Sequence, residues 1–199
     1  SLVPVMNKNQ LDDIAEQFLR DHYKKALLEP IWVDPTELAE SMGLTIRYEN
    51  ITKDGSIFGR SFFYDCETEL YDEDADEMYK VTIPARTILV DKKAAFLMVL
   101  GATNNTIVHE CVHWDKHKKA FALARLYDNE LSNIGCRVVG GIAGNKRDAI
   151  EWMEWQANAL APRIQMPITM FKKKVNQLIS KYRKETHTYD MIDIIELII

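Results

Sequence analysis

The chain carries an H-E-x-x-H segment, His109-Glu110-Cys111-Val112-His113, whose spacing suits metal chemistry. On an α-helix, positions four apart lie on the same face, so both imidazoles can reach one metal ion. Glu110 stands about 100° further round the helix and can approach a metal-bound water without binding the metal itself. This arrangement is typical of zinc hydrolases, in which two histidines hold the metal and the glutamate takes a proton from the water.

The residues around this segment indicate a mostly buried helix. Ile107 and Val108 precede it, and Cys111 and Val112 fill its two variable positions. By chance, H-E-x-x-H should occur in very roughly one chain of this length in two hundred. A His-Glu-His set on a helix with so apolar a back face has few structural uses, so we interpret the segment as a metal site.

A catalytic zinc ion usually has three protein ligands and one open position, so a third ligand must come from elsewhere. The extended metzincin motif is excluded, because Lys116 and Lys119 stand where that motif has glycine and histidine. His117 follows His113 by four residues, but on a straight helix it would lie about 12 Å from His109 along the axis. We therefore expect His117 to support the site rather than to bind the metal.

A later helical stretch offers carboxylates for the third position. Glu151 and Glu154 both lie in it, and the spacing alone leaves both open as ligands. Asn158, one turn after Glu154, is placed to orient a motif histidine from behind. Small residues such as Ala157 and Ala161 would let this stretch pack closely against the motif helix.

Over about residues 86–167 the sequence resembles the ImmA/IrrE metallopeptidase family. The resemblance rests on Thr106-Ile107-Val108-His109-Glu110-Cys111-Val112-His113 with His117, on Glu154-Trp155-Gln156-Ala157-Asn158-Ala159-Leu160-Ala161, and on Gln165-Met166-Pro167. It implies that His109, His113 and Glu154 bind Zn²⁺, that Glu110 is the general base, and that Glu154 rather than Glu151 is the third ligand. Members of that family are described as cytoplasmic proteases that cleave a partner transcriptional repressor. The chain departs from the family pattern by a longer gap, with an insertion around residues 127–147, and by Pro162.

The positioning elements can be predicted from hydrophobic periodicity and from turn residues. We expect helices over residues 8–29, from Asp34-Pro35 to Gly43, and over 103–126, 148–160, 171–184 and 189–199. We expect strands over residues 44–51 and 58–64, and one or two more over 79–90, interrupted at Pro84. Residues 65–77 look like a solvated hairpin loop and 127–147 like a flexible, glycine-rich connection, while Pro162 and Pro167 bracket a helix end.

These elements predict an α+β fold, in which a small, mostly antiparallel sheet packs against several helices and the zinc lies between two of them. Residues 87–90 are expected to form a sheet edge beside the site that could hold a peptide by strand addition. With 199 residues and 47% hydrophobic content, we expect a single domain, 1–199, with its own core.

Charge and cysteine content narrow the class of protein further. The net charge of -5 shows no excess of basic residues, so a direct nucleic-acid partner is not expected. No apolar run approaches the length of a membrane span. Cys66, Cys111 and Cys136 lack metal or redox spacing and are interpreted as free thiols of a reducing compartment, which predicts a cytoplasmic protein.

These patterns predict a zinc-dependent metallo-endopeptidase that cleaves one specific intracellular protein, and the family resemblance suggests a DNA-binding repressor. An alternative is an anti-repressor that keeps the metal but regulates its partner by binding alone. A third possibility is a zinc hydrolase with a non-protein substrate. Glu110 favours hydrolysis, because a binding protein has no need of a general base. Arg163, His187 and Tyr189 are candidates for stabilising the oxyanion.

Overall fold

The computed structural model describes residues 3–97, 100–124, 133–137 and 149–186. The α-helices are α1 (Leu11–His22), α2 (Pro35–Ser41), α3 (Lys92–Leu97), α4 (Leu100–Val112), α5 (Lys118–Ala124), α6 (Ala149–Gln165) and α7 (Ile168–Thr186). Two 3₁₀ turns and one π-helical turn join them: η1 (Lys8–Gln10), η2 (Lys24–Leu27) and η3 (His113–His117). The strands are β1 (Thr45–Glu49), β2 (Ile57–Phe62), β3 (Cys66–Asp72), β4 (Glu77–Ile83), β5 (Thr87–Asp91) and β6 (Asn133–Arg137).

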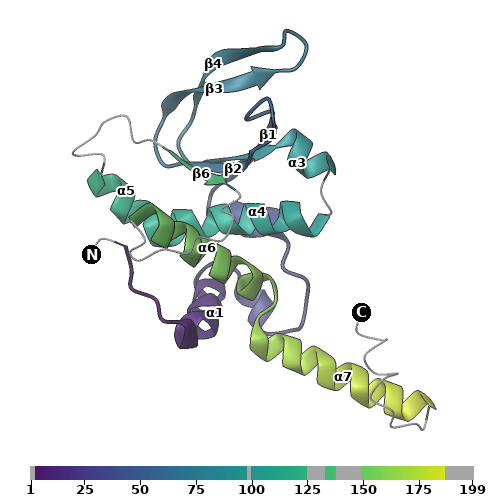
Figure 1. The fold of residues 1–199 in the computed structure, drawn as a ribbon. Helices are drawn as coiled ribbons and strands as arrows, with labels where there is room; N and C mark the ends of the chain where they lie inside the picture. Colours follow the sequence, from purple (N-terminus) through teal and green to yellow (C-terminus); the bar gives the residue numbers. More distant parts are fainter. Residues whose placement is uncertain (1–2, 98–99, 125–132, 138–148, 187–199) are drawn as a thin grey trace.

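Four strands form a mixed sheet in the order β1-β5-β2-β6. β1 pairs with β5 in parallel, whereas β5 with β2 and β2 with β6 are antiparallel pairs. β3 and β4 form a separate antiparallel hairpin, which lies above the sheet in Figure 1. Helices pack against one face of the sheet, so the predicted α+β fold is confirmed.

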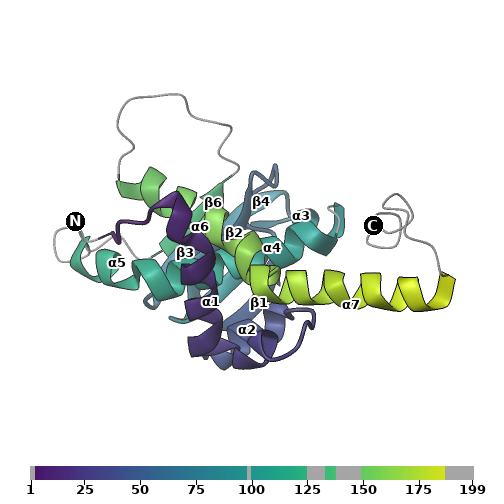
Figure 2. The same cartoon turned by 90° about the horizontal axis from the view of Figure 1, so that it is seen from below.

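Helix α4 lies in the middle of the molecule, between the sheet and the other helices. It packs against β2 on one side and against α6 on the other (Figure 1), and it also contacts α2. Seen from below, α1 and α2 lie beside each other, while α7 extends away from the remaining elements (Figure 2). The motif helix is therefore supported from several directions.

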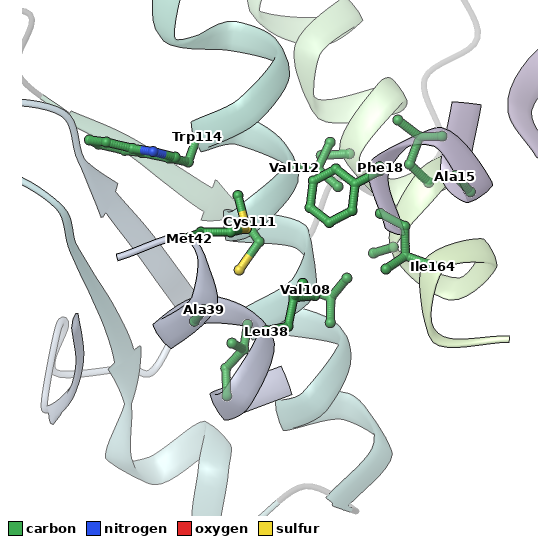
Figure 3. Packing of buried hydrophobic residues seen from close by; sticks show 14 of the residues in the cluster. Ala15, Phe18, Leu38, Ala39, Met42, Val108, Cys111, Val112, Trp114 and Ile164 are labelled. Atoms are coloured by element: carbon green, nitrogen blue, oxygen red, sulfur yellow. The ribbon is translucent and has the colours of Figure 1, made fainter. Parts of the chain in front are cut away.

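The apolar back of α4 fixes how this helix is rotated. Val108 and Cys111 meet α2 near Leu38 and Met42, and Val112 lies beside α1 (Figure 3). All of these side chains are buried in one cluster. Full burial of a valine or leucine stabilises the fold by about 1.5–3 kcal/mol. Because this face of α4 is buried in the core, the face that carries the motif histidines and Glu110 must turn toward β2 and α6.

Helix α2 begins and ends as the sequence predicts. The Asp34 side chain accepts hydrogen bonds from the backbone N–H groups of Thr36 and Glu37, at 2.8 and 3.3 Å, and Pro35 takes the first helical position. Gly43 has a φ of 66°, a left-handed conformation that glycine adopts without strain after a helix end. The helix predicted over residues 8–29 is confirmed in part: η1 and α1 cover its first half, but α1 ends at His22 and η2 follows as a separate turn that ends at Leu27.

Two segments that were predicted to be irregular contain strands. β3 occupies most of residues 65–77, where a solvated loop was expected. Glu67 and Glu69 are exposed on one face while Leu70 is buried, so the acidic side chains are the wet side of a strand. In the segment 127–147, which was expected to be a glycine-rich connection, β6 pairs antiparallel with β2, a long-range contact that the local sequence does not signal.

Several helices differ from those predicted. Pro162 lies inside α6, which continues to Gln165, so the prediction of an end near residue 160 is wrong. Leu160 and Ile164 are fully buried, and this packing outweighs the backbone hydrogen bond that proline removes. The single helix predicted over residues 103–126 is interrupted by η3, and α3 was not predicted. α7 confirms the helix over 171–184, while the one over 189–199 lies outside the described residues.

The prediction of a sheet edge at residues 87–90 is wrong. These residues belong to β5, which is paired with β1 on one side and with β2 on the other. All five residues of β5 are buried, as suits an interior strand covered on both faces. Within the described ranges, β6 has a strand neighbour only on the side of β2.

Neither Cys66 nor Cys111 forms a disulfide bond, and the side chain of Cys136 lies outside the described part. Among the helices that the structure describes, none combines the length and the apolar character needed to cross a membrane.

Candidate metal centre

Two helices bring the three predicted ligands together. His109 lies on the last turn of α4, His113 begins η3, and Glu154 lies on α6, which packs against α4. The two histidine Nε2 atoms are 2.9 Å apart. Glu154 Oε2 lies 3.3 Å from His109 Nε2, and Glu154 Oε1 lies 3.3 Å from His113 Nε2. One ligand atom from each residue lies within 4.8 Å of the other two, so the group could hold a metal ion.

The group is withdrawn from water. The exposed fraction is 1% for His109, 0% for His113 and 7% for Glu154. Burial lowers the pKa of His113 to about 4, so this imidazole is neutral at neutral pH. Burial alone would raise the pKa of Glu154, but its contacts with the His109 and His113 imidazoles outweigh this effect and hold the pKa at about 2. Neutral imidazole and ionised carboxylate are the protonation states that bind a metal ion.

The chemistry of these donors fits zinc. Two imidazole nitrogens and one carboxylate oxygen form the donor set of one well-known class of catalytic zinc site, which leaves a fourth position open for water or substrate. The ligand atoms are already gathered and shielded from water, so the three side chains could hold a positive ion.

Glu110 lies beside this group and is held by β2. Its side chain is fully buried, and Oε2 accepts a 2.6 Å hydrogen bond from the Ser61 hydroxyl. Oε1 has no hydrogen-bond partner among the described residues. A Cβ atom on Gly59 would lie 2.6 Å from Thr106 Cγ2 and 3.1 Å from Glu110 Oε1, so only glycine lets β2 approach α4 this closely. One carboxylate oxygen is thus anchored while the other remains available to accept a proton.

Burial also determines the acidity of Glu110. It raises the pKa of this carboxyl to about 7, although the charge of His109 and the Ser61 hydrogen bond oppose the shift. A carboxyl with a pKa near neutral pH is well matched to general acid–base work.

The other predicted candidates lie in less suitable places. Glu151 is not a member of the metal group. Asn158 is exposed, so the expected hydrogen bond from it to a motif histidine is not formed. The Arg163 guanidinium is held by Asp12 and by the Ala159 carbonyl, at 3.0 and 2.7 Å. His187 and Tyr189 lie outside the described residues.

His117 does not join the metal group but lies directly behind it. Its Nδ1 is 2.9 Å from His113 Nδ1, and its Nε2 is 2.9 Å from Gln156 Oε1. Burial lowers the pKa of His117 to about 3, so it too is neutral. This agrees with the expectation of a supporting role. Gln156 and Ser61 were missed, because each meets its partner only through tertiary packing and no local spacing signals such a contact.

Comparisons of the chain with protein-family models, with curated proteins and with solved structures found no significant match.

The raised pKa of Glu110 predicts a dependence of stability on pH. In the metal-free protein, the contribution of Glu110 is fully present below its ordinary pKa of 4.5 and is lost as the pH rises through about 7. The loss amounts to about 3 kcal/mol for a shift of this size. We expect Glu110→Gln to gain stability relative to the wild type by about that amount between pH 5 and pH 8. Urea unfolding of both metal-free proteins at each pH would measure it, and parallel pH profiles would contradict it.

Proposed function

We propose that this protein is a zinc-dependent metallo-endopeptidase that cleaves a specific intracellular protein, a transcriptional repressor. The observation that carries the proposal is the buried His109–His113–Glu154 group with Glu110 beside it. Glu110 keeps one carboxylate oxygen without a hydrogen-bond partner in the described structure, at a cost in free energy that hydrolysis would justify. The resemblance of the motif segments to the ImmA/IrrE family supports both the peptidase class and the repressor substrate.

The chain's own residues supply the proton transfers. His109, His113 and Glu154 would hold Zn²⁺, which lowers the pKa of water and polarises a carbonyl group when it is bound. Glu110 Oε1 accepts the proton of the attacking water, while Ser61 keeps the other oxygen fixed. Glu110 then returns this proton to the nitrogen of the leaving amine as the carbon–nitrogen bond breaks. A carboxyl pKa near 7 allows both transfers at neutral pH.

The substrate would be held by strand addition, at a different strand from the one predicted. β5 is interior, whereas β6 offers an unpaired side within the described ranges and packs against α4. An extended peptide along β6 would run past the motif helix and gain main-chain hydrogen bonds. The net charge of -5 also suits a basic DNA-binding partner.

The substrate class can be tested by comparing the cleavage of two proteins. Zinc-loaded protein should cut a repressor encoded beside its gene at one site in an exposed segment, and should leave unfolded casein largely intact. Fragments would be separated on a gel and their masses measured. Efficient digestion of casein without cleavage of the repressor would contradict the proposal and indicate a general peptidase.

An anti-repressor that acts by binding alone is the second candidate. It would retain the metal group, but it would gain nothing from a buried Glu110 carboxylate with one oxygen that no described residue binds. Stable complex formation with the repressor, with no fragments after prolonged incubation with zinc, would favour this candidate over the peptidase.

A further inference from the structure

A chain of buried hydrogen bonds runs from the metal group to the N-terminal segment. His113 Nδ1 is 2.9 Å from His117 Nδ1, and His117 Nε2 is 2.9 Å from Gln156 Oε1. The Gln156 amide nitrogen then donates to the backbone carbonyl of Pro4, at 2.6 Å. His113, His117 and Gln156 are all buried. Three elements, η3, α6 and the segment before η1, thus meet behind one metal ligand.

The chemistry of the last member fixes the direction of every bond in this chain. A backbone carbonyl can only accept, so Gln156 must turn its NH₂ group toward Pro4 and its oxygen toward His117. The reversed amide would place two acceptors 2.6 Å apart. Since the Gln156 oxygen can only accept, His117 must carry its proton on Nε2.

The proton on His117 in turn determines which nitrogen of His113 is protonated. A neutral His117 with its proton on Nε2 presents a lone pair at Nδ1. The short contact between the two Nδ1 atoms is then a hydrogen bond only if His113 donates from Nδ1. The remaining nitrogen of His113, Nε2, carries no proton and faces His109 and Glu154.

We propose that His117 and Gln156 are positioning residues that hold His113 in the Nδ1–H tautomer, with the bare Nε2 directed at the metal position. The inference deepens the proposed function, because it takes His113 as a metal ligand. A histidine ligand usually donates its other N–H to a neighbouring group, which fixes the ring and its tautomer. Here that neighbour is another histidine, and the π-helical turn η3 carries both rings. The tautomer is set before any metal arrives, so binding requires no transfer of this proton.

The tautomer can be read directly from the metal-free wild-type protein. Long-range ¹H–¹⁵N NMR spectra distinguish a protonated from an unprotonated ring nitrogen. We expect His113 to be protonated at Nδ1 only and His117 at Nε2 only. A His113 protonated at Nε2 in the wild type would overturn the inference, and this result would not depend on whether the protein cleaves anything.

Gln156→Leu removes the amide that sets the direction of these hydrogen bonds while keeping a side chain of similar size. Gln165→Leu is the matched control, since Gln165 lies on the same helix and bonds to Asn105 and Ala161 instead. In Gln156→Leu the His113 signals should show protonation at Nε2 in part of the molecules, and zinc affinity should fall about 10–100-fold. Both should stay unchanged in Gln165→Leu. An unchanged tautomer and an unchanged affinity in folded Gln156→Leu would contradict the role of Gln156.

Zinc affinity, measured by competition with a coloured chelator, separates this inference from the proposed function. A fall in affinity in Gln156→Leu supports the positioning role even if no substrate is ever cleaved. Conversely, a repressor-cleaving wild type with His113 in the other tautomer would keep the proposed function and remove the inference.

Discussion

Replacing Glu110 with glutamine is expected to lower the rate of substrate cleavage about 10²–10⁴-fold, which is the usual cost of losing a general base. The amide keeps the shape of the side chain, and its oxygen can still accept the 2.6 Å hydrogen bond from Ser61. An NH₂ group then stands where Oε1 stood, and it cannot accept the proton of the attacking water. Single-turnover cleavage of the repressor, followed on a gel, measures the loss.

Zinc content should be determined on the same samples, because Glu110 is not among the three residues of the metal group. Ser61→Ala provides a graded control: it frees the anchored oxygen but leaves the carboxylate, so its rate should lie between those of the wild type and Glu110→Gln. Turnover close to the wild-type rate in zinc-loaded Glu110→Gln would show that Glu110 is not the base.

The metal group could be predicted from the sequence because half of its geometry is local. His109 and His113 are four residues apart, and helix geometry alone puts them on one face. The third ligand could not be predicted from spacing alone, because Glu151 and Glu154 fit equally well. Only the resemblance of the surrounding residues to a known family favoured Glu154. In the structure Glu154, not Glu151, meets the two histidines.

The residues that surround this group could not be predicted in the same way. Ser61 is 49 residues from Glu110, and Gln156 is 39 residues from His117. Such contacts depend on how β2 and α6 pack on α4, and no periodicity in the sequence encodes them. Gln156 was passed over in favour of Asn158, whose spacing from Glu154 is helical but whose side chain points to solvent.

The errors in the predicted fold share a physical cause, which is that tertiary packing overrode local signals. Pro162 should end a helix, but burial of Leu160 and Ile164 carries α6 onward. The order of strands in the sheet depends on long-range pairing, so residues 87–90 were assigned to an edge although they lie in the interior. β3 was not predicted as a strand, because its acidic residues Glu67 and Glu69 are also typical of a solvated loop.

Replacing Glu154 with alanine is expected to weaken zinc binding by more than about 100-fold, since even residues behind a metal ligand contribute about 10–100-fold. The substitution leaves two imidazoles without the carboxylate that lies 3.3 Å from each of them. Glu151→Ala is the matched control, three residues earlier on the same helix and outside the metal group. It should bind zinc as the wild type does. Chelator competition on the three proteins gives the comparison.

Metal binding is tested most directly by the zinc content of the wild-type chain and of these two variants after loading, removal of free metal and elemental analysis. We expect one zinc per chain in the wild type and in Glu151→Ala, and almost none in Glu154→Ala. Loss of zinc from Glu151→Ala with retention in Glu154→Ala, or a folded wild-type chain that retains no zinc, would show that His109, His113 and Glu154 do not form a metal site.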